Sequence, residues 1–335
     1  MIEIKEALSQ HSVIKVIGIG DAGGNAINYM IKQCVQGVEF IAIDTDAQTL
    51  HRSLAHTRLR IGAEITDGLE VFQQSSASKS AAEEFHERIR TLICNADMVF
   101  ITAGMEGSTG TDVVPVVAQI AREINIVTVA VVAMPLAHGD ERICYADEVI
   151  KALHEHVDAL IIVPHTTAKE DLCNLTPAPE AFTATNLSIH RAIVGIVGMS
   201  DRNGLISIDF SEVCAILSKA GIVMMGVGLA SGPGRESIAA RQAMADLMSG
   251  NMDMNDARTI LINFTSTGSL KLKEVAEVMK YVKVATRNAM MVCGASVDES
   301  MDKELCVTVF AIGLCVPLES NPVIQIRTDK AKNNF

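Results

Sequence analysis

The sequence predicts an α/β protein, with a doubly wound parallel sheet in the first half of the chain and a second, smaller α/β domain after it. Short β-branched runs alternate with segments of helical apolar spacing, which is typical of that class. Two glycine-rich turns, at 20–25 and 104–111, each follow a buried-strand pattern and precede a helix pattern. A length of 335 residues is long for one hydrophobic core and indicates two domains.

The elements expected in the first half follow from apolar patterning. Buried strands are expected at 13–19, 38–43, 98–102, 127–133 and 159–163. Helices are expected at 26–31, 81–94, 113–123 and 146–156. Parallel strands joined by helices bring the two glycine-rich turns to one carboxyl edge of the sheet, where open α/β sheets bind their ligands.

A long helix at 181–199 is expected to connect the two halves, because it follows the prolines at 177 and 179 and keeps an apolar face. After it, helices are expected at 210–220, 237–248 and 272–282, and strands at 222–228, 259–265, 289–295 and 305–314. The expected organisation is 1–178 for the first domain, 179–202 for the central helix, 203–315 for the second domain and 316–335 for a short polar tail.

Composition narrows the classes of function. The formal net charge is −12 and no basic run is present, which argues against nucleic acid or an anionic membrane surface as a partner. The eight cysteines are scattered without metal-ligand spacing, so we expect reduced thiols in a cytoplasmic protein and no structural metal. We also find no pattern of a signal peptide or of a membrane-spanning segment.

The two glycine-rich turns have the composition of an anion site. In the second turn glycines alternate with hydroxyl residues, and backbone N–H groups at the start of a helix suit a phosphate. A tight turn without a ligand explains the same residues. The first turn contains Gly18, Gly20 and Gly23 in dinucleotide-fold spacing, with Asp44 at the end of the next strand, so a dehydrogenase is an alternative on these residues alone.

Taken together, the motifs of this chain resemble those of the bacterial cell-division FtsZ family, a relative of tubulin. The resemblance runs from residue 13 to 313 and rests on Val16-Ile17-Gly18, Gly23-Gly24-Asn25-Ala26, Asp44-Thr45-Asp46-Ala47-Gln48, Ala103-Gly104-Met105, Thr109-Gly110-Thr111 and Asn203-Gly204-Leu205. It displaces the dehydrogenase alternative. It implies a GTP-binding domain, a central helix and a smaller domain whose acidic loop completes the site of the next subunit in a head-to-tail filament.

The resemblance also implies site residues. For the nucleotide these are Gly20, Asp21, Ala22, Gly23, Gly24, Asn25, Gly104, Gly107, Ser108, Thr109, Gly110, Thr111, Arg142, Phe182 and Asn186. For catalysis they are Asp209 and Glu212. Helix capping accounts for these two carboxylates as well, and we favour it over catalysis because Glu212 in place of Asp moves the carboxylate by one methylene.

Several positions depart from the family pattern. Asp21, Glu106 and Asp112 add carboxylates around a site for a triphosphate. Leu187 stands where the family has a guanine-binding acid, and leucine cannot accept a hydrogen bond. The remaining departures are Ala22 in a loop of glycines, His165 in place of the Asn that reads guanine, and the segment 70–79, which has neither glycine nor proline.

We therefore expect an FtsZ-like cytoskeletal subunit that binds GTP or GDP weakly, takes Mg²⁺ only with the nucleotide, and hydrolyses GTP slowly or not at all. Its expected partners are further copies of itself, head to tail, or another FtsZ-family protein. Direct membrane docking is not expected, because 316–335 lacks the family's linker and docking peptide. Two alternatives stay open: an active GTP-hydrolysing polymer, and a non-polymerising regulator of a true family member.

Overall fold

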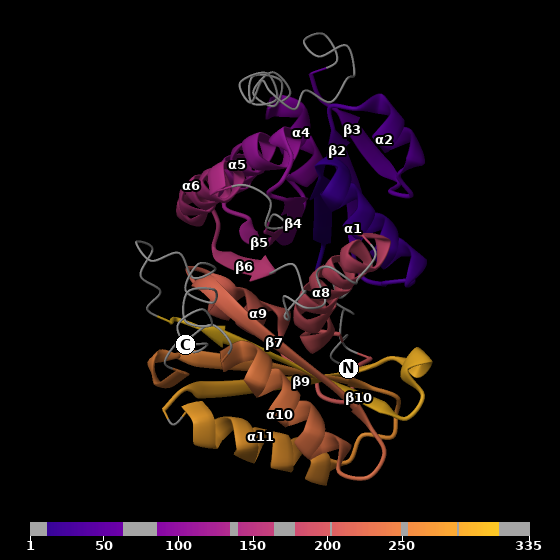
Figure 1. Cartoon of the computed structure of the whole chain (residues 1–335), viewed down its shortest axis with the longest axis vertical. Coiled ribbons are helices and arrows are strands. Elements are labelled where there is room, and N and C mark those ends of the chain that lie inside the picture. The colour runs from indigo at the N-terminus through magenta and orange to yellow at the C-terminus, as the bar shows by residue number, and fades with distance from the viewer. Residues whose placement is uncertain are drawn as a thin grey trace, which may run out of the picture.

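The computed structural model describes residues 12–62, 86–134, 140–163, 178–201, 203–248, 254–286 and 288–314; the side chains of 140–145, 147, 178–182 and 255 are outside this description. Within these ranges, strands form one mixed ten-stranded sheet in the order β3-β2-β1-β4-β5-β6-β7-β10-β8-β9. Figure 1 shows how the helices are arranged around this sheet. The predicted α/β class is confirmed.

The first half is a parallel sheet with crossover helices. Its elements are β1 (Ile14–Ile19), α1 (Gly20–Lys32), β2 (Glu39–Asp44), α2 (Ala47–Arg52), β3 (Thr57–Arg60), α4 (His86–Ile93), β4 (Met98–Gly104), α5 (Ser108–Glu123), β5 (Val127–Ala133), α6 (Asp140–His156) and β6 (Ala159–Val163). The five strands predicted here are confirmed to within two residues at each end. The sequence missed α2 and β3, because six and four residues are too few to show a period.

Both faces of the parallel sheet are buried. Side chains alternate between two cores: Ile17 and Ile101 pack with α4, α5 and α6, whereas Val16 and Phe100 pack with α1 and α8 (Ala178–Met199). Strands covered on both faces are apolar at nearly every position. This is why they appear in the sequence as continuous apolar runs.

The second half is a mixed sheet with helices packed on it. Its elements are α9 (Phe210–Leu217), β7 (Gly221–Ser231), α10 (Arg235–Met248), β8 (Thr259–Ser266), α11 (Leu272–Thr286), β9 (Met290–Val297) and β10 (Glu304–Ile312), with 3₁₀ turns at Met254–Asp256 and Glu299–Met301. The strand β10 lies between β7 and β8 and is antiparallel to both. The helix α9 is three residues shorter than expected, because the backbone leaves the helical region at Ser218, with ψ of 118°, and Lys219 then adopts a left-handed conformation with φ of 62°.

One sheet passes through both halves. The strand β6 pairs in parallel with β7 at three positions, beginning with Ala159 opposite Gly221. Next to this pairing, the Asp158 carboxylate accepts the Thr128 N–H at 3.0 Å through Oδ2 and the Lys219 N–H at 3.3 Å through Oδ1. The Asp158 carbonyl accepts the Gly221 N–H at 2.9 Å. Asp158 therefore joins β5, the end of α9 and β7.

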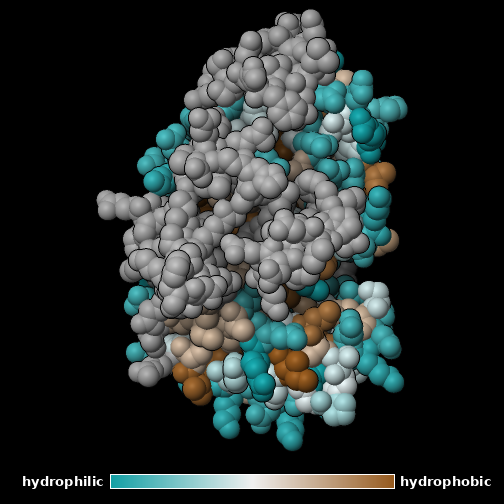
Figure 2. All heavy atoms as spheres, viewed as in Figure 1, coloured by the Kyte–Doolittle hydropathy of each residue, from teal (hydrophilic) through white to brown (hydrophobic). Residues whose placement is uncertain are grey.

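The outer face of the second half carries apolar residues between charged ones. Figure 2 shows this mixture at the end of the molecule where α10 and α11 lie. Val284 is 75% exposed and Met248 47% exposed, and both line a groove between the two helices together with Glu277 and Lys280. In the part of the chain that the structure describes, every helix is too short or too polar to cross a lipid bilayer.

We expect Asp158→Ala to lower the midpoint of thermal unfolding by about 2–4 °C, equivalent to about 1–2 kcal/mol, because two N–H groups at the junction lose their acceptor. Differential scanning calorimetry measures this shift. Glu148→Ala, which removes an exposed carboxylate from α6, is the control and should leave the midpoint unchanged. Equal midpoints for Asp158→Ala and the control contradict the role assigned to Asp158.

Candidate functional site

The two glycine-rich turns meet at the carboxyl edge of the parallel sheet. Strands β1 and β4 are neighbours, with Ile19 opposite Ala103, so the turns that follow them lie side by side. The helix α1 begins at Gly20, not near residue 26 as the apolar pattern suggested, and the first glycine turn is its first helical turn. Glycine and Asp are weak helix formers, which hid this start in the sequence.

Backbone contacts fix the glycines of this edge. A Cβ on Gly23 would lie 2.4 Å from the Thr102 carbonyl oxygen, and one on Gly110 would lie 2.3 Å from the Gly104 carbonyl oxygen. Gly20 has φ of +70°, a conformation that side chains disfavour. Only glycine fits these positions, so the turns interlock without a ligand.

Two helix N-termini point to this edge without side-chain caps. The residues before the first turns are Ile19 for α1 and Gly107 for α5, and neither supplies a side-chain hydrogen bond. The first N–H groups of a helix have no partner within the helix, and the helix dipole favours an anion beside them.

The threonine hydroxyls of the second turn are engaged inside the protein. Thr109 Oγ1 lies 3.2 Å from Thr45 Oγ1, and Thr111 Oγ1 donates to the carbonyls of Gly107 and Ser108 at 3.1 Å. Thr109 and Thr111 are both buried. These two hydroxyls already have partners inside the protein. The donors that this turn offers to a ligand are therefore mainly backbone N–H groups.

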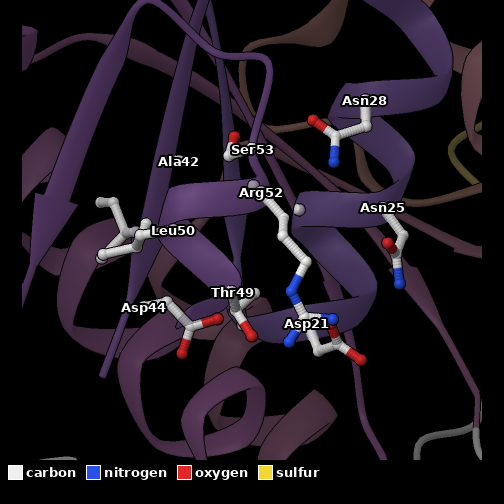
Figure 3. Close-up of a pocket in the computed structure, with 13 residues that line it drawn as sticks. Asp21, Asn25, Asn28, Ala42, Asp44, Thr49, Leu50, Arg52 and Ser53 are labelled. Atoms are coloured by element: carbon white, nitrogen blue, oxygen red, sulfur yellow. The ribbon is translucent and has the colours of Figure 1, made fainter. Parts of the chain in front are cut away.

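A pocket lies beside the first turn, between α1 and α2 (Figure 3). About 390 Å³ of its space is free of atoms, part of it open to solvent. Figure 3 shows Asn25 and Asn28 extending from α1, and Arg52 extending from α2 toward Asp21. Gly24 lines the pocket, and a Cβ there would have no atom within 4 Å. Residue 24 therefore borders open space.

Asn28 and Arg52 line this pocket but were not among the predicted site residues. Asn28 follows Asn25 at the helical spacing of three, which could have indicated a polar face on α1. No comparable pattern marks Arg52, because it lies at the end of the short helix α2, which the sequence did not predict. Its position depends on the pairing of β1 with β2.

The remaining predicted residues differ in exposure. Asp21, Ala22 and Asn25 are exposed, Asn186 is half-buried in α8, and Asp112 is 8% exposed within α5. Asp112 is therefore largely shielded from solvent, which the sequence did not indicate. Several predicted positions lie outside the described residues: the side chains of Arg142 and Phe182, residue 165, and the segments 70–79, 137–139 and 316–335.

Asp209 and Glu212 lie in the second half of the molecule. Asp209 occupies the N-cap position of α9, but its side chain makes no cap hydrogen bond, so the capping interpretation is wrong for its carboxylate. Both side chains are exposed. The neighbouring Ile208 N–H donates to the carbonyl of Met199, the last residue of α8, and Met199 packs against Gly294 of β9. The structure does not bring these carboxylates into the pocket between α1 and α2.

Comparison with known proteins gives matches along most of the chain. Residues 13–170 match the GTPase domain of the Tubulin/FtsZ family, and residues 221–315 match the C-terminal domain of the FtsZ family. The cell division protein FtsZ of Coxiella burnetii is 42% identical over 94% of this chain and 82% of its own length. That of Wigglesworthia glossinidia brevipalpis is 38% identical over 97% and 85%.

A solved structure of an empty FtsZ dimer from M. jannaschii has the same fold. It superposes with a TM-score of 0.84 at 33% identity, and the match covers 90% of this chain and 88% of that one. The similarity therefore extends over both halves and over the edge where the two glycine turns meet.

Two adjacent glycine substitutions test the geometry of the first turn. Gly24→Ala should leave the free energy of unfolding unchanged or raise it by up to about 1 kcal/mol, because its Cβ enters open space and alanine favours a helix. Its thermal midpoint should therefore be equal to that of the unmodified chain or higher. Gly23→Ala should lower stability by about 2 kcal/mol or more, because its Cβ meets the Thr102 carbonyl. Thermal unfolding of the two variants tests this difference in stability. Equal midpoints for Gly23→Ala and Gly24→Ala would contradict the described packing.

Proposed function

We propose that this chain, which belongs to the FtsZ family, is a filament subunit that binds a guanine nucleotide weakly at the paired glycine turns and hydrolyses it slowly or not at all. The observation that carries the proposal is the meeting of two uncapped helix N-termini beside an open pocket. Their N–H groups suit the phosphates of a nucleotide. The relatives named above are cell division proteins, which supports a role in division.

The expected weakness of binding rests on charge and on base recognition. Asp21 is exposed in the first turn of α1, and its carboxylate opposes a triphosphate over distances up to about 8 Å at physiological salt. Leu187 is half-buried in α8 and offers no acceptor to the N1 and N2 donors of guanine. Mg²⁺ enters with the nucleotide and offsets part of the phosphate charge.

The same proposal places hydrolysis between subunits. Asp209 and Glu212 are exposed on the second half and are not among the residues that line the pocket beside the first glycine turn. In a head-to-tail filament they would face the nucleotide of the next subunit and hold the attacking water. Glu212 in place of Asp shifts one carboxylate, which lowers the rate because a displacement of about 1 Å costs on the order of a hundredfold.

A second candidate function is an active GTP-hydrolysing polymer. The observation in its favour is that the Asp209 carboxylate makes no capping hydrogen bond and is therefore available for catalysis. Phosphate release measured above the critical concentration separates the two candidates. Turnover that rises with assembly and is lost in Asp209→Ala supports the active polymer, whereas background release supports the first proposal.

Calorimetric titration with GTP and Mg²⁺ should give a dissociation constant on the order of 100 µM or weaker, about −5.5 kcal/mol or less favourable. ATP should compete to a similar degree, because Leu187 does not select guanine. Leu187→Asp is the matched variant and should raise the preference for GTP over ATP. A submicromolar, guanine-selective constant for the unmodified chain would refute this prediction.

Assembly should not depend on which nucleotide is present. A nucleotide that binds the free subunit and the filament equally does not shift the equilibrium between them. If binding is weak, the contact between subunits is stabilised by protein groups. Light scattering and electron microscopy with GTP, GDP and no nucleotide test this expectation. Filaments that need GTP and disassemble as it is consumed would contradict it and favour the active polymer.

A further inference from the structure

We infer that Arg52 is the charge partner of Asp21 and keeps the first glycine turn accessible to phosphate. This inference rests on the proposed nucleotide site and adds a residue that the sequence did not assign to it. It concerns the carboxylate at position 21, which opposes a phosphate as long as nothing offsets its charge.

The geometry brings the two side chains to one pocket. Asp21 is in the first turn of α1 and Arg52 is the last residue of α2, and both line the space between these helices. Figure 3 shows the Arg52 side chain extending along the pocket toward Asp21. Asn25 and Thr49 lie beside them and add polar groups to this side of the pocket.

Charge around the pocket is unbalanced without Arg52. Among the described residues that line it, Asp21 and Asp44 are acidic, and Arg52 is the sole Lys or Arg. Arg60, which is paired with Asp44 in the sheet, donates its Nε–H to the Thr45 carbonyl at 3.3 Å and does not line the pocket. Removing Arg52 would therefore leave only negative side-chain charge there.

The field of Arg52 also reaches the adjacent loop. The pKa of Asp46 is lowered, mainly because the Gln48 N–H donates to its carboxylate at 2.8 Å, and the positive charge of Arg52 acts in the same direction. Asp46 already caps α2 through Gln48 and Thr49. Asp21 has no such capping role, because the N-cap of α1 is Ile19.

A cycle of variants separates this role from direct contact with the nucleotide. Equilibrium dialysis with labelled GTP and Mg²⁺ should show about tenfold weaker binding for Arg52→Gln and tighter binding for Asp21→Gly. The double variant should return to within about twofold of the unmodified chain. Arg52→Lys should retain binding to within about threefold, because it keeps the charge. Lys32→Gln removes an exposed charge from α1 outside the pocket and should have no effect.

If Arg52→Gln and the double variant bind equally weakly, Arg52 acts directly on the nucleotide and the inference is overturned. A lack of effect in Arg52→Gln overturns it as well. If no variant binds GTP, the proposed nucleotide function fails, and thermal unfolding without nucleotide then decides on the pair. At low salt the sum of the midpoint shifts of the two single variants should exceed the midpoint shift of the double variant by about 1 °C. This difference should vanish at 1 M salt. Additive shifts at low salt would refute the pair.

Discussion

Two backbone carbonyls, those of Thr102 and Gly104, determine the geometry of the site. Each lies so close to a glycine of the neighbouring helix start, Gly23 or Gly110, that a Cβ would overlap with it. This contact brings the N-termini of α1 and α5 to one edge of the sheet and holds them there without a ligand. A preformed cradle loses little freedom on binding, which lowers the free-energy cost of capturing an anion.

The same contact decides which positions tolerate other residues. Asp21 and Ala22 are exposed in the first turn of α1, so a side chain there changes the charge and shape of the site without disturbing the fold. The side chain at position 22 does affect one neighbour, because the Ala22 methyl lies 2.7 Å from where a Cβ on Gly104 would be. The glycines that face carbonyls are thus retained by packing, whereas the exposed positions 21 and 22 accept side chains.

Most of the fold could be predicted from the sequence, because buried parallel strands give continuous apolar runs and helices a regular spacing. The start of α1 could not, since glycine and Asp hide a helical turn. Side-chain roles were harder: Asp209 matches a capping pattern but makes no cap bond, and Arg52 joins the pocket only through the pairing of β1 with β2. Such roles depend on tertiary contacts, which a local pattern does not contain.

The place of β10 in the sheet affects how the chain folds as it is synthesised. This strand is the last one described, yet it lies between β7 and β8, which precede it by a long stretch of chain. Until residue 312 has left the ribosome, β7 and β8 each have an unpaired edge that another nascent chain can join. The first half has no such delay, because its strands are complete by Val163. The second half is therefore the part whose strand edges stay unpaired longest during translation.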